Sequence, residues 1–219
     1  MSEPGPLGLS LRAGLVLFAF ALAFTTLMAL TYNATKDTIA ASTEEEKMKL
    51  VNEVLPPGDY DNALLADYVE APPAPLLGVD RPARIFRARK SGAPAALVLE
   101  AVAPDGYSGA IALLVAVRAN GEIAGVRVTS HRETPGLGDY VDIRKDRNKS
   151  RPWITRFNGL SFGSLAEARW RVKKDGGEID FVSGATISAR AVTHAVARAL
   201  KYALENRDKL FSAPSQSRL

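Results

Sequence analysis

Cysteine is absent from the 219-residue sequence, and histidine occurs only twice, as His131 and His194. The lack of cysteine excludes disulfide bonds, cysteine-ligated iron–sulfur clusters, CxxCH haem attachment and thiol catalysis within this chain. The scarcity of histidine argues against a histidine-rich metal site, so no metal ligand is expected. Redox chemistry in this chain would therefore need an organic cofactor.

Neither sign of charge dominates. The chain has 28 Lys and Arg against 24 Asp and Glu, which gives a net charge of +4. There is no polybasic tail and no run of aromatic residues between basic ones, so no nucleic-acid partner is expected. Six basic side chains occur between Arg144 and Arg156. Such a run is usually a solvated face, and contact with an acidic partner protein or with lipid headgroups stays open.

The amino-terminal region contains a long apolar run. No charged residue occurs from Ala13 to Thr35, and a helix of this length can cross the hydrocarbon core of a bilayer. A cleaved signal peptide and a buried core helix are the alternatives. The run is longer than a usual signal-peptide core, which favours an uncleaved transmembrane helix over residues 13–35. Basic residues lie on both sides of it, so charge counting leaves its orientation open.

The region after the apolar run predicts a stalk. Residues Thr38 to Leu55 have helical spacing, and Pro56-Pro57-Gly58 ends the pattern. We interpret this helix as a solvated stalk. Prolines between Ala71 and Gly78 predict an extended connector. Residues 36–80 are therefore expected to join the span to a folded domain at residues 81–210, with a flexible tail at 211–219.

Alternating apolar residues in the middle of the chain predict strands. The candidates are Ile85 to Arg89, Ala95 to Val102, Ile111 to Arg118 and Glu122 to Ser130. Asn120-Gly121 between the last two is typical of a tight hairpin, because both residues tolerate positive φ. With the helices that follow, the pattern predicts an α+β fold with antiparallel hairpins.

The carboxy-terminal half predicts two helices and a set of buried aromatics. Ser164 is expected to begin a short helix that runs to about Val172. A longer helix from about Ala189 to Asn206 has an apolar stripe, with Ser188 as its N-cap. The chain beyond Leu210 is polar and expected to be frayed. Trp153, Phe157 and Trp170 are interpreted as core or interface aromatics.

The most informative stretch runs from Asp180 to Ser188, with the sequence DFVSGATIS. Small residues at 183–185 allow a close backbone approach, and Thr186 is expected at the start of a helix. The N–H groups and the positive dipole end of such a helix favour a phosphate, and the threonine hydroxyl can accept a phosphoryl group. Taken alone, a glycine-containing turn followed by a serine cap is the simpler interpretation.

The motif Asp-x-x-Ser-Gly-Ala-Thr, which ends at Thr186, resembles the flavinylation motif of the FMN-binding domain in the G subunit of Rnf electron transport complexes. The C subunit of sodium-translocating NADH:quinone reductases shares this motif. The resemblance implies FMN joined through its phosphate to Thr186 by a flavin transferase that uses FAD. Phe181 departs from the Gly that many members have after the Asp. The overall length of the chain is more similar to that of the Rnf subunit than to that of the quinone-reductase subunit.

Two further stretches occur in the order that the family has, namely Gly106-Tyr107-Ser108-Gly109 and His131 to Gly138, which reads HRETPGLG. The resemblance implies that the second stretch contacts the flavin. A structural hydrogen-bonding role is preferred for His131 and Glu133 over an acid–base pair, and no catalytic residue is expected. The candidate cofactor-binding residues are Thr186 (covalent FMN), Asp180, Ser183, Gly184, Ala185, Ser188, His131, Glu133, Thr134, Pro135, Gly136, Leu137 and Gly138.

The resemblance also implies a function. The chain would be a membrane-anchored electron-transfer subunit with covalent FMN, in an Rnf-type ion-translocating ferredoxin:NAD oxidoreductase complex. Residues 1–12 would be cytoplasmic, and the domain would be extracytoplasmic, on the periplasmic side of a bacterial inner membrane. Its partners would be the other proteins of the complex, membrane lipid and the flavin transferase. Because no GxGxxG fingerprint is present, the chain would not be a complete enzyme alone. The alternative is a membrane-bound FMN-binding sensory or assembly module without redox turnover.

Overall fold

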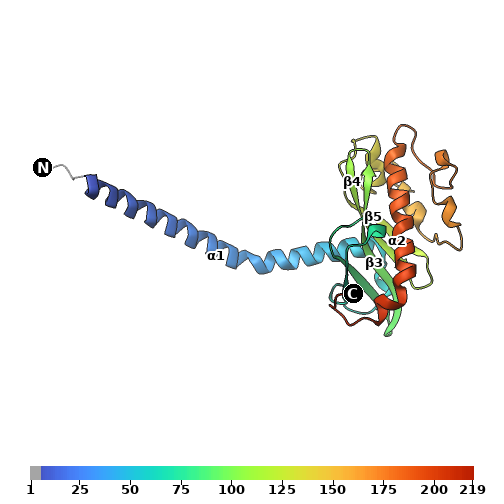
Figure 1. Cartoon of the computed structure of the whole chain (residues 1–219), viewed down its shortest axis with the longest axis horizontal. Coiled ribbons are helices and arrows are strands. Elements are labelled where there is room, and N and C mark those ends of the chain that lie inside the picture. The colour runs from blue at the N-terminus through green and yellow to red at the C-terminus, as the bar shows by residue number, and fades with distance from the viewer. Residues whose placement is uncertain (1–5) are drawn as a thin grey trace. The chain divides into compact units, whose positions relative to one another are not determined.

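The structure is a computed structural model that describes residues 6–219, with the side chains of 6–9, 37, 38, 40, 41 and 43 left out (Figure 1). The chain divides into two compact units, Met1–Lys47 and Met48–Leu219. The described part of the first unit is one helical segment, and the described strands all lie in the second unit.

The helix α1 (Pro6–Val54) supplies the whole described part of the first unit and ends in the second. Its segment Ser10–Lys36 is long and apolar enough to cross a membrane, and none of it is buried within the protein. The hydroxyl groups of Thr31 and Thr35 donate to the carbonyls of Leu27 and Thr31, at 2.8 and 2.9 Å. These bonds satisfy the hydroxyl groups inside the helix itself, as an apolar environment requires.

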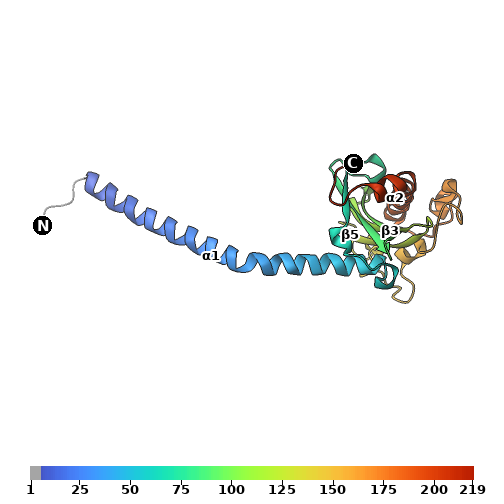
Figure 2. The same ribbon diagram turned by 90° about the horizontal axis from the view of Figure 1, so that it is seen from below.

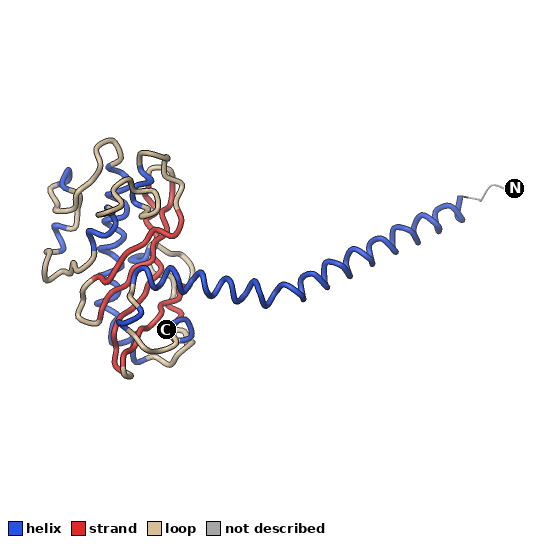
Figure 3. Tube along the Cα trace, turned by 180° about the vertical axis from the view of Figure 1, so that it is seen from behind, coloured by secondary structure: helices blue, strands red, loops and turns tan. Residues whose placement is uncertain are grey.

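The second unit is built on a five-stranded antiparallel sheet in the order β1-β2-β3-β4-β5 (Figure 3). Each strand pairs with the one before it, so the sheet is a meander. The sheet and the helices that flank it confirm the predicted α+β class. The strands are β1 (Tyr68–Ala71), β2 (Ala83–Lys90), β3 (Ala93–Gly106), β4 (Gly109–Arg118) and β5 (Ile123–Ser130).

The two faces of the sheet are both covered. The helix α2 (Thr186–Ser212) packs on one face, where Leu97 and Leu99 of β3 are buried (Figure 2). Successive strand side chains alternate between faces, so Ala96 and Val98 point to the other. That second face is covered by residues at and after the end of α1, namely Val51, Val54, Leu55 and Leu64.

The end of α1 is therefore part of the core, so the predicted solvated stalk does not extend to Leu55. Val54 is 1% exposed, and its backbone lies so close to β5 that a Cβ on Gly125 would meet the Val54 carbonyl oxygen at 2.6 Å. The expected connector is also part of the domain, because β1 (Tyr68–Ala71) is paired with β2 and Leu77 is fully buried. The apolar residues at the end of α1 were visible in the sequence. The sheet face on which they pack was not, because it is formed by distant strands.

The carboxy-terminal end of the chain is ordered against β1. The helix α2 continues to Ser212, and Glu70 then donates its backbone N–H to the Ser217 carbonyl at 2.9 Å. The N–H of Leu219 returns to the Glu70 carbonyl at 3.1 Å. The expectation of a frayed tail was wrong, because β1 is an edge strand and its free backbone groups accept these partners.

Two other local expectations need correction. The predicted helix from Ser164 to Val172 is only a three-residue 3-10 turn, Glu167–Arg169. Ser188 is not an N-cap, because α2 begins earlier and its N-cap is Ala185. The expectation for the aromatics is confirmed, since Trp153, Phe157 and Trp170 are all buried.

Candidate functional site

The amino-terminal end of α2 lies where the motif predicts, with Thr186 as its first residue. The preceding Ala185 makes no side-chain capping hydrogen bond. The first N–H groups of an α-helix have no partner within the helix, so they are available to a ligand. Gly184 has a φ of +88°, and a Cβ there would meet nothing within 4 Å. The chain thus enters α2 through a turn that leaves the space in front of the helix open.

A pocket of about 260 Å³ lies at this end of the helix. Its wall comes from three stretches that are far apart in the sequence: the β3–β4 turn, the loop after β5 and the start of α2. The lining residues are Tyr107, Glu133, Thr134, Leu137, Gly138, Gly184, Ala185, Thr186, Ile187 and Ser188.

Several side chains of this rim are apolar and exposed. Tyr107 is 68% exposed, Leu137 53% and Ile187 42%. Apolar side chains of this size are more often buried, and an exposed group of them beside a pocket is typical of a binding site. The pocket therefore combines an apolar rim with a helix amino terminus, and these two features suit a planar ring and an anionic group respectively.

Buried groups beneath the pocket hold the segment before α2 in place. The hydroxyl of Tyr140 donates to the Ala185 carbonyl and accepts from the Val182 N–H, both at 3.3 Å. Burial raises the pKa of Tyr140 to about 12, so its hydroxyl stays protonated and able to donate. One phenol thus closes the loop from Val182 to Ala185 just before the helix begins.

Asp180 is an anchor of the same segment and does not line the pocket. Its carboxylate forms ion pairs with Arg156 and Lys173, the latter at 2.6 Å. The hydrogen bond from Lys173, with the nearby Arg156 charge, lowers the pKa of Asp180 despite partial burial. Its carbonyl accepts the indole N–H of Trp153 at 2.6 Å. The first residue of the motif is therefore fixed by side chains from other parts of the fold.

Glu133 joins the three stretches that form the pocket. Its side chain is buried, and its carboxylate accepts the Ser108 N–H at 3.1 Å and the hydroxyl of Ser188. Space at this junction is so limited that a Cβ on Gly138 would meet Ser188 Oγ at 2.5 Å and Glu133 Oε2 at 2.7 Å. Gly138 is therefore required for the close approach of the loop to the helix.

His131 does not line the pocket and has a structural partner. Its Nδ1 accepts the Glu133 N–H at 3.1 Å, and its Nε2 lies 3.7 Å from Asp142 Oδ2. These contacts support the structural role that we preferred for His131.

The thirteen candidate residues separate into two groups in the structure. Those that line the pocket are Glu133, Thr134, Leu137, Gly138, Gly184, Ala185, Thr186 and Ser188. Those that lie in the same loops without lining it are His131, Pro135, Gly136, Asp180 and Ser183. Tyr107 and Ile187 also line the pocket but were not among the candidates. Their positions in the sequence could have indicated them, because Tyr107 lies in the Gly106-to-Gly109 turn and Ile187 follows Thr186.

Comparison with known families agrees with this geometry. Residues 106–201 match the FMN-binding domain family, a range that contains every residue lining the pocket. Residues 10–54 match the RnfG N-terminal region, which covers nearly all of α1. The uncapped helix terminus, the Thr186 hydroxyl and the exposed apolar rim are the features that an FMN phosphate and ring require, so the residues present fit this cofactor.

Relatives match along almost the whole chain, and all three named here are the G subunit of an ion-translocating oxidoreductase complex. The chain is 46% identical over 207 residues to the protein from Pseudomonas aeruginosa strain PAO1, covering 94% of each. It is 40% identical to the protein from Pseudoalteromonas atlantica, with the same coverage. For Vibrio cholerae the identity is 38%, over 93% of this chain and 95% of the relative. The chain therefore belongs to the RnfG family, with an FMN-binding domain after an apolar amino-terminal helix.

Proposed function

We propose that this chain is the electron-transfer subunit of an ion-translocating oxidoreductase complex and that it carries FMN covalently on Thr186. One observation carries the covalent part of the proposal. The Thr186 hydroxyl stands in the wall of a pocket, at the first residue of a 27-residue helix whose amino terminus has no side-chain cap. A hydroxyl and a set of free N–H groups thus meet at one point.

The attachment is a phosphoryl transfer with FAD as donor. The Thr186 oxygen forms a bond to the phosphorus on the FMN side of the pyrophosphate, the bridging P–O bond breaks, and AMP leaves. The hydroxyl proton is released to solvent, so the step needs no oxidant. The N–H groups and the positive dipole end of α2 stabilise the phosphate charge. A flavin transferase is expected to perform this step during maturation.

The residues around the pocket position the cofactor. When bound, the flavin supplies one-electron transfer, which the side chains of this protein cannot. Tyr140 and Glu133 fix the two loops that meet α2, and the apolar rim offers a surface to the ring. A covalent bond prevents loss of the cofactor from so exposed a site.

The segment Ser10–Lys36 is proposed to anchor the chain as a single transmembrane span in a bacterial inner membrane. We propose that the domain lies on the periplasmic side, in contact with other proteins of the complex, and that the span contacts lipid. Cysteine accessibility reporters placed at the two ends of the segment Ser10–Lys36, which are exposed, test this orientation. Only the end in the periplasm reacts with an impermeant thiol reagent in whole cells.

The function is tested by co-expressing the full chain with a flavin transferase. A denaturing gel viewed under ultraviolet light should show a fluorescent band, and the intact mass should rise by FMN less one water. Thr186→Ala should abolish both signals, whereas Thr186→Ser, which keeps a hydroxyl, should retain part of the labelling. A dark wild-type band beside a labelled control protein would overturn the covalent assignment. Redox titration of the labelled protein then separates an electron carrier from a sensory or assembly module.

A further inference from the structure

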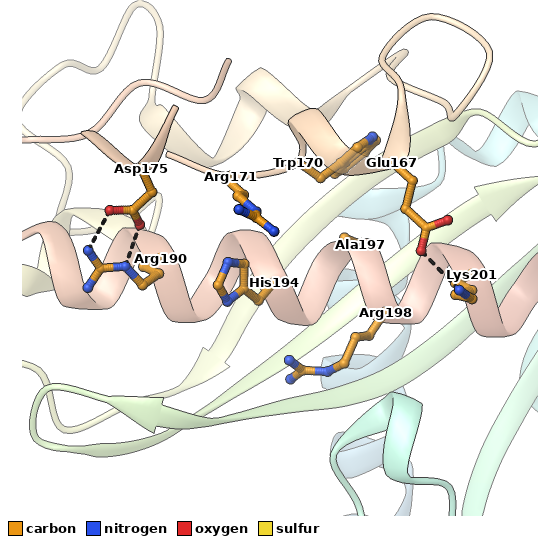
Figure 4. Close-up of a pocket in the computed structure, with 9 residues that line it drawn as sticks. All are labelled: Glu167, Trp170, Arg171, Asp175, Arg190, His194, Ala197, Arg198 and Lys201. Atoms are coloured by element: carbon orange, nitrogen blue, oxygen red, sulfur yellow. Dashed lines mark hydrogen bonds and ion pairs between the residues drawn. The ribbon is translucent and has the colours of Figure 1, made fainter. Parts of the chain in front are cut away.

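A second, larger hollow of about 570 Å³ lies along α2, on the side of the segment Glu167–Asp175 (Figure 4). The residues that α2 contributes follow a helical stripe of Arg190, His194, Ala197, Arg198 and Lys201. Residues four apart lie on the same face of a helix. Thr186 precedes Arg190 by four positions, so it continues this stripe, about 6 Å further along the axis. We call this hollow the basic groove.

The basic groove carries more positive than negative charge. Four cations, Arg171, Arg190, Arg198 and Lys201, face two carboxylates, those of Glu167 and Asp175. Each carboxylate has one cation partner, since Arg190 bonds Asp175 at 2.5 and 2.9 Å and Lys201 bonds Glu167 at 3.0 Å. Among the residues that the structure describes, Arg171 and Arg198 have no carboxylate partner.

His194 lines the groove with Arg171 and Arg198 but adds little charge near neutral pH, because its pKa is lowered. Burial lowers the pKa of His194, and the charges of Arg198 and Arg171 lower it further, against an opposing effect of Asp105. The permanent positive charge of the groove therefore comes from its arginine and lysine side chains alone.

The chemistry of the groove favours carboxylates over a nucleotide. Trp170 is only 2% exposed, is stacked on Phe157 and donates its indole N–H to the Leu165 carbonyl, so it offers no free face to a base. A guanidinium group binds a carboxylate through two parallel hydrogen bonds. Arg171 and Arg198 stand on different elements, so two such groups suit separate acidic side chains better than one compact phosphate.

We propose that the basic groove is the docking site for an acidic segment of the redox partner protein. A partner seated there ends one helical turn from Thr186, and complementary charge speeds encounter and fixes orientation. The partner's carboxylates would pair with Arg171 and Arg198, while Arg190 and Lys201 stay paired with Asp175 and Glu167. The redox role of the partner rests on the function proposed above, whereas the acidic binding site does not.

The test measures binding of a fluorescein-labelled octaglutamate peptide to the full chain in detergent, by fluorescence anisotropy at low ionic strength. Arg171→Gln with Arg198→Gln should weaken binding about tenfold, the loss of two charge-assisted pairs. Lys145→Gln with Lys149→Gln removes the same charge from a different exposed loop and should change the Kd less than about twofold. Glu167→Gln with Asp175→Asn should strengthen binding, which a misfolded variant could not do.

Two outcomes would overturn the groove proposal. The first is equal loss in both double variants, which would indicate attraction by net charge alone. The second is displacement of the peptide by pyrophosphate at a lower concentration than by unlabelled peptide, which would indicate a phosphate ligand. Thr186→Ala should bind the peptide as the wild type does. A dark gel band with intact peptide binding would contradict the flavin assignment only, and a fluorescent band without peptide binding would contradict the groove only.

Discussion

At the scale of single residues, Tyr140 shows how a side chain outside the pocket controls the motif inside it. Its hydroxyl is the only group among the described residues that bonds both the Val182 N–H and the Ala185 carbonyl. Tyr140→Phe should lower the free energy of unfolding by about 1–2 kcal/mol, because the buried Ala185 carbonyl and the Val182 N–H lose this partner. Urea denaturation measures the stability, and the rate of flavin incorporation should fall as the loop loosens. An unchanged labelling rate would show that the loop does not need this bond.

Tyr140 also predicts a pH dependence. Its pKa is raised to about 12 in the folded protein, above the value of 10.0 expected when unfolded. The contribution to stability is therefore fully present below pH 10 and is lost as the pH rises through 12. The difference between the folded and unfolded pKa values corresponds to about 2–3 kcal/mol of the free energy of unfolding. The wild type should lose more stability between pH 9 and pH 11 than Tyr140→Phe does, as followed by urea denaturation at each pH.

Gly138 provides a steric test at the same scale. A Cβ at this position would crowd Ser188 and Glu133, so Gly138→Ala should destabilise the domain by about 1–3 kcal/mol and reduce flavin incorporation. Gly58→Ala is the matched control, because nothing lies within 4 Å of a Cβ there. Thermal unfolding distinguishes the two, and equal behaviour would mean that the loop can move away from the helix.

At the scale of elements, the end of α2 is held to the sheet by a buried arginine. Arg87 of β2 is 2% exposed, and it donates to the carbonyls of Leu210 and Ala213 at 2.9 and 2.5 Å. It also forms an ion pair with Asp67. These contacts place a positive charge at the carboxy-terminal end of the helix, where its dipole favours one.

Arg87→Met should therefore lower the free energy of unfolding by about 3 kcal/mol. It removes a partner from the buried Leu210 carbonyl, from the Ala213 carbonyl and from the partly buried Asp67 carboxylate. Arg84→Met on the same strand is the control, because Arg84 is half exposed and its ion pair with Glu70 is long, at 3.7 Å. Chemical denaturation of both variants checks the difference. A loss of the same size in the control would refute the special role of the buried position.

The elements themselves were predictable to different degrees. The four strand candidates are confirmed, because alternation and the Asn120-Gly121 turn are local signals, although only Gly121 takes a positive φ. The β2–β3 turn was missed. Its residues Ser91 and Gly92 both have positive φ, and serine rarely adopts that conformation. The start of α2 was placed at Thr186 by the motif, whereas Ser188, the conventional cap, serves Glu133 instead.

At the scale of the whole molecule, one chain contains a segment able to span a membrane and a separate folded unit with its own core. The site is assembled from residues 107 to 188, so no single local pattern reveals it. The motif around Thr186 and the loop ending at Gly138 were both identified from the sequence. Their meeting through Glu133 was not, because it depends on packing between distant segments.

The basic groove could not be predicted from the sequence, because it forms only when distant elements pack together. Arg171 and Arg198 stand on different elements, and in the sequence each looks like an ordinary surface charge. Only the packing of the segment Glu167–Asp175 along α2 brings them into the lining of one hollow. Charge runs such as Arg144 to Arg156 are visible in a sequence, whereas charge gathered by folding is not.

The covalent attachment of FMN is the claim on which the functional account depends. Cleavage by trypsin after Lys174 and Arg190 gives a peptide of residues 175–190 that contains the hydroxyl groups of Ser183, Thr186 and Ser188. Tandem mass spectrometry of this peptide, after co-expression with a flavin transferase, locates the added mass. The account predicts FMN less one water on Thr186 alone. Attachment at Ser183 or Ser188, or an unmodified peptide beside a labelled control protein, would contradict it.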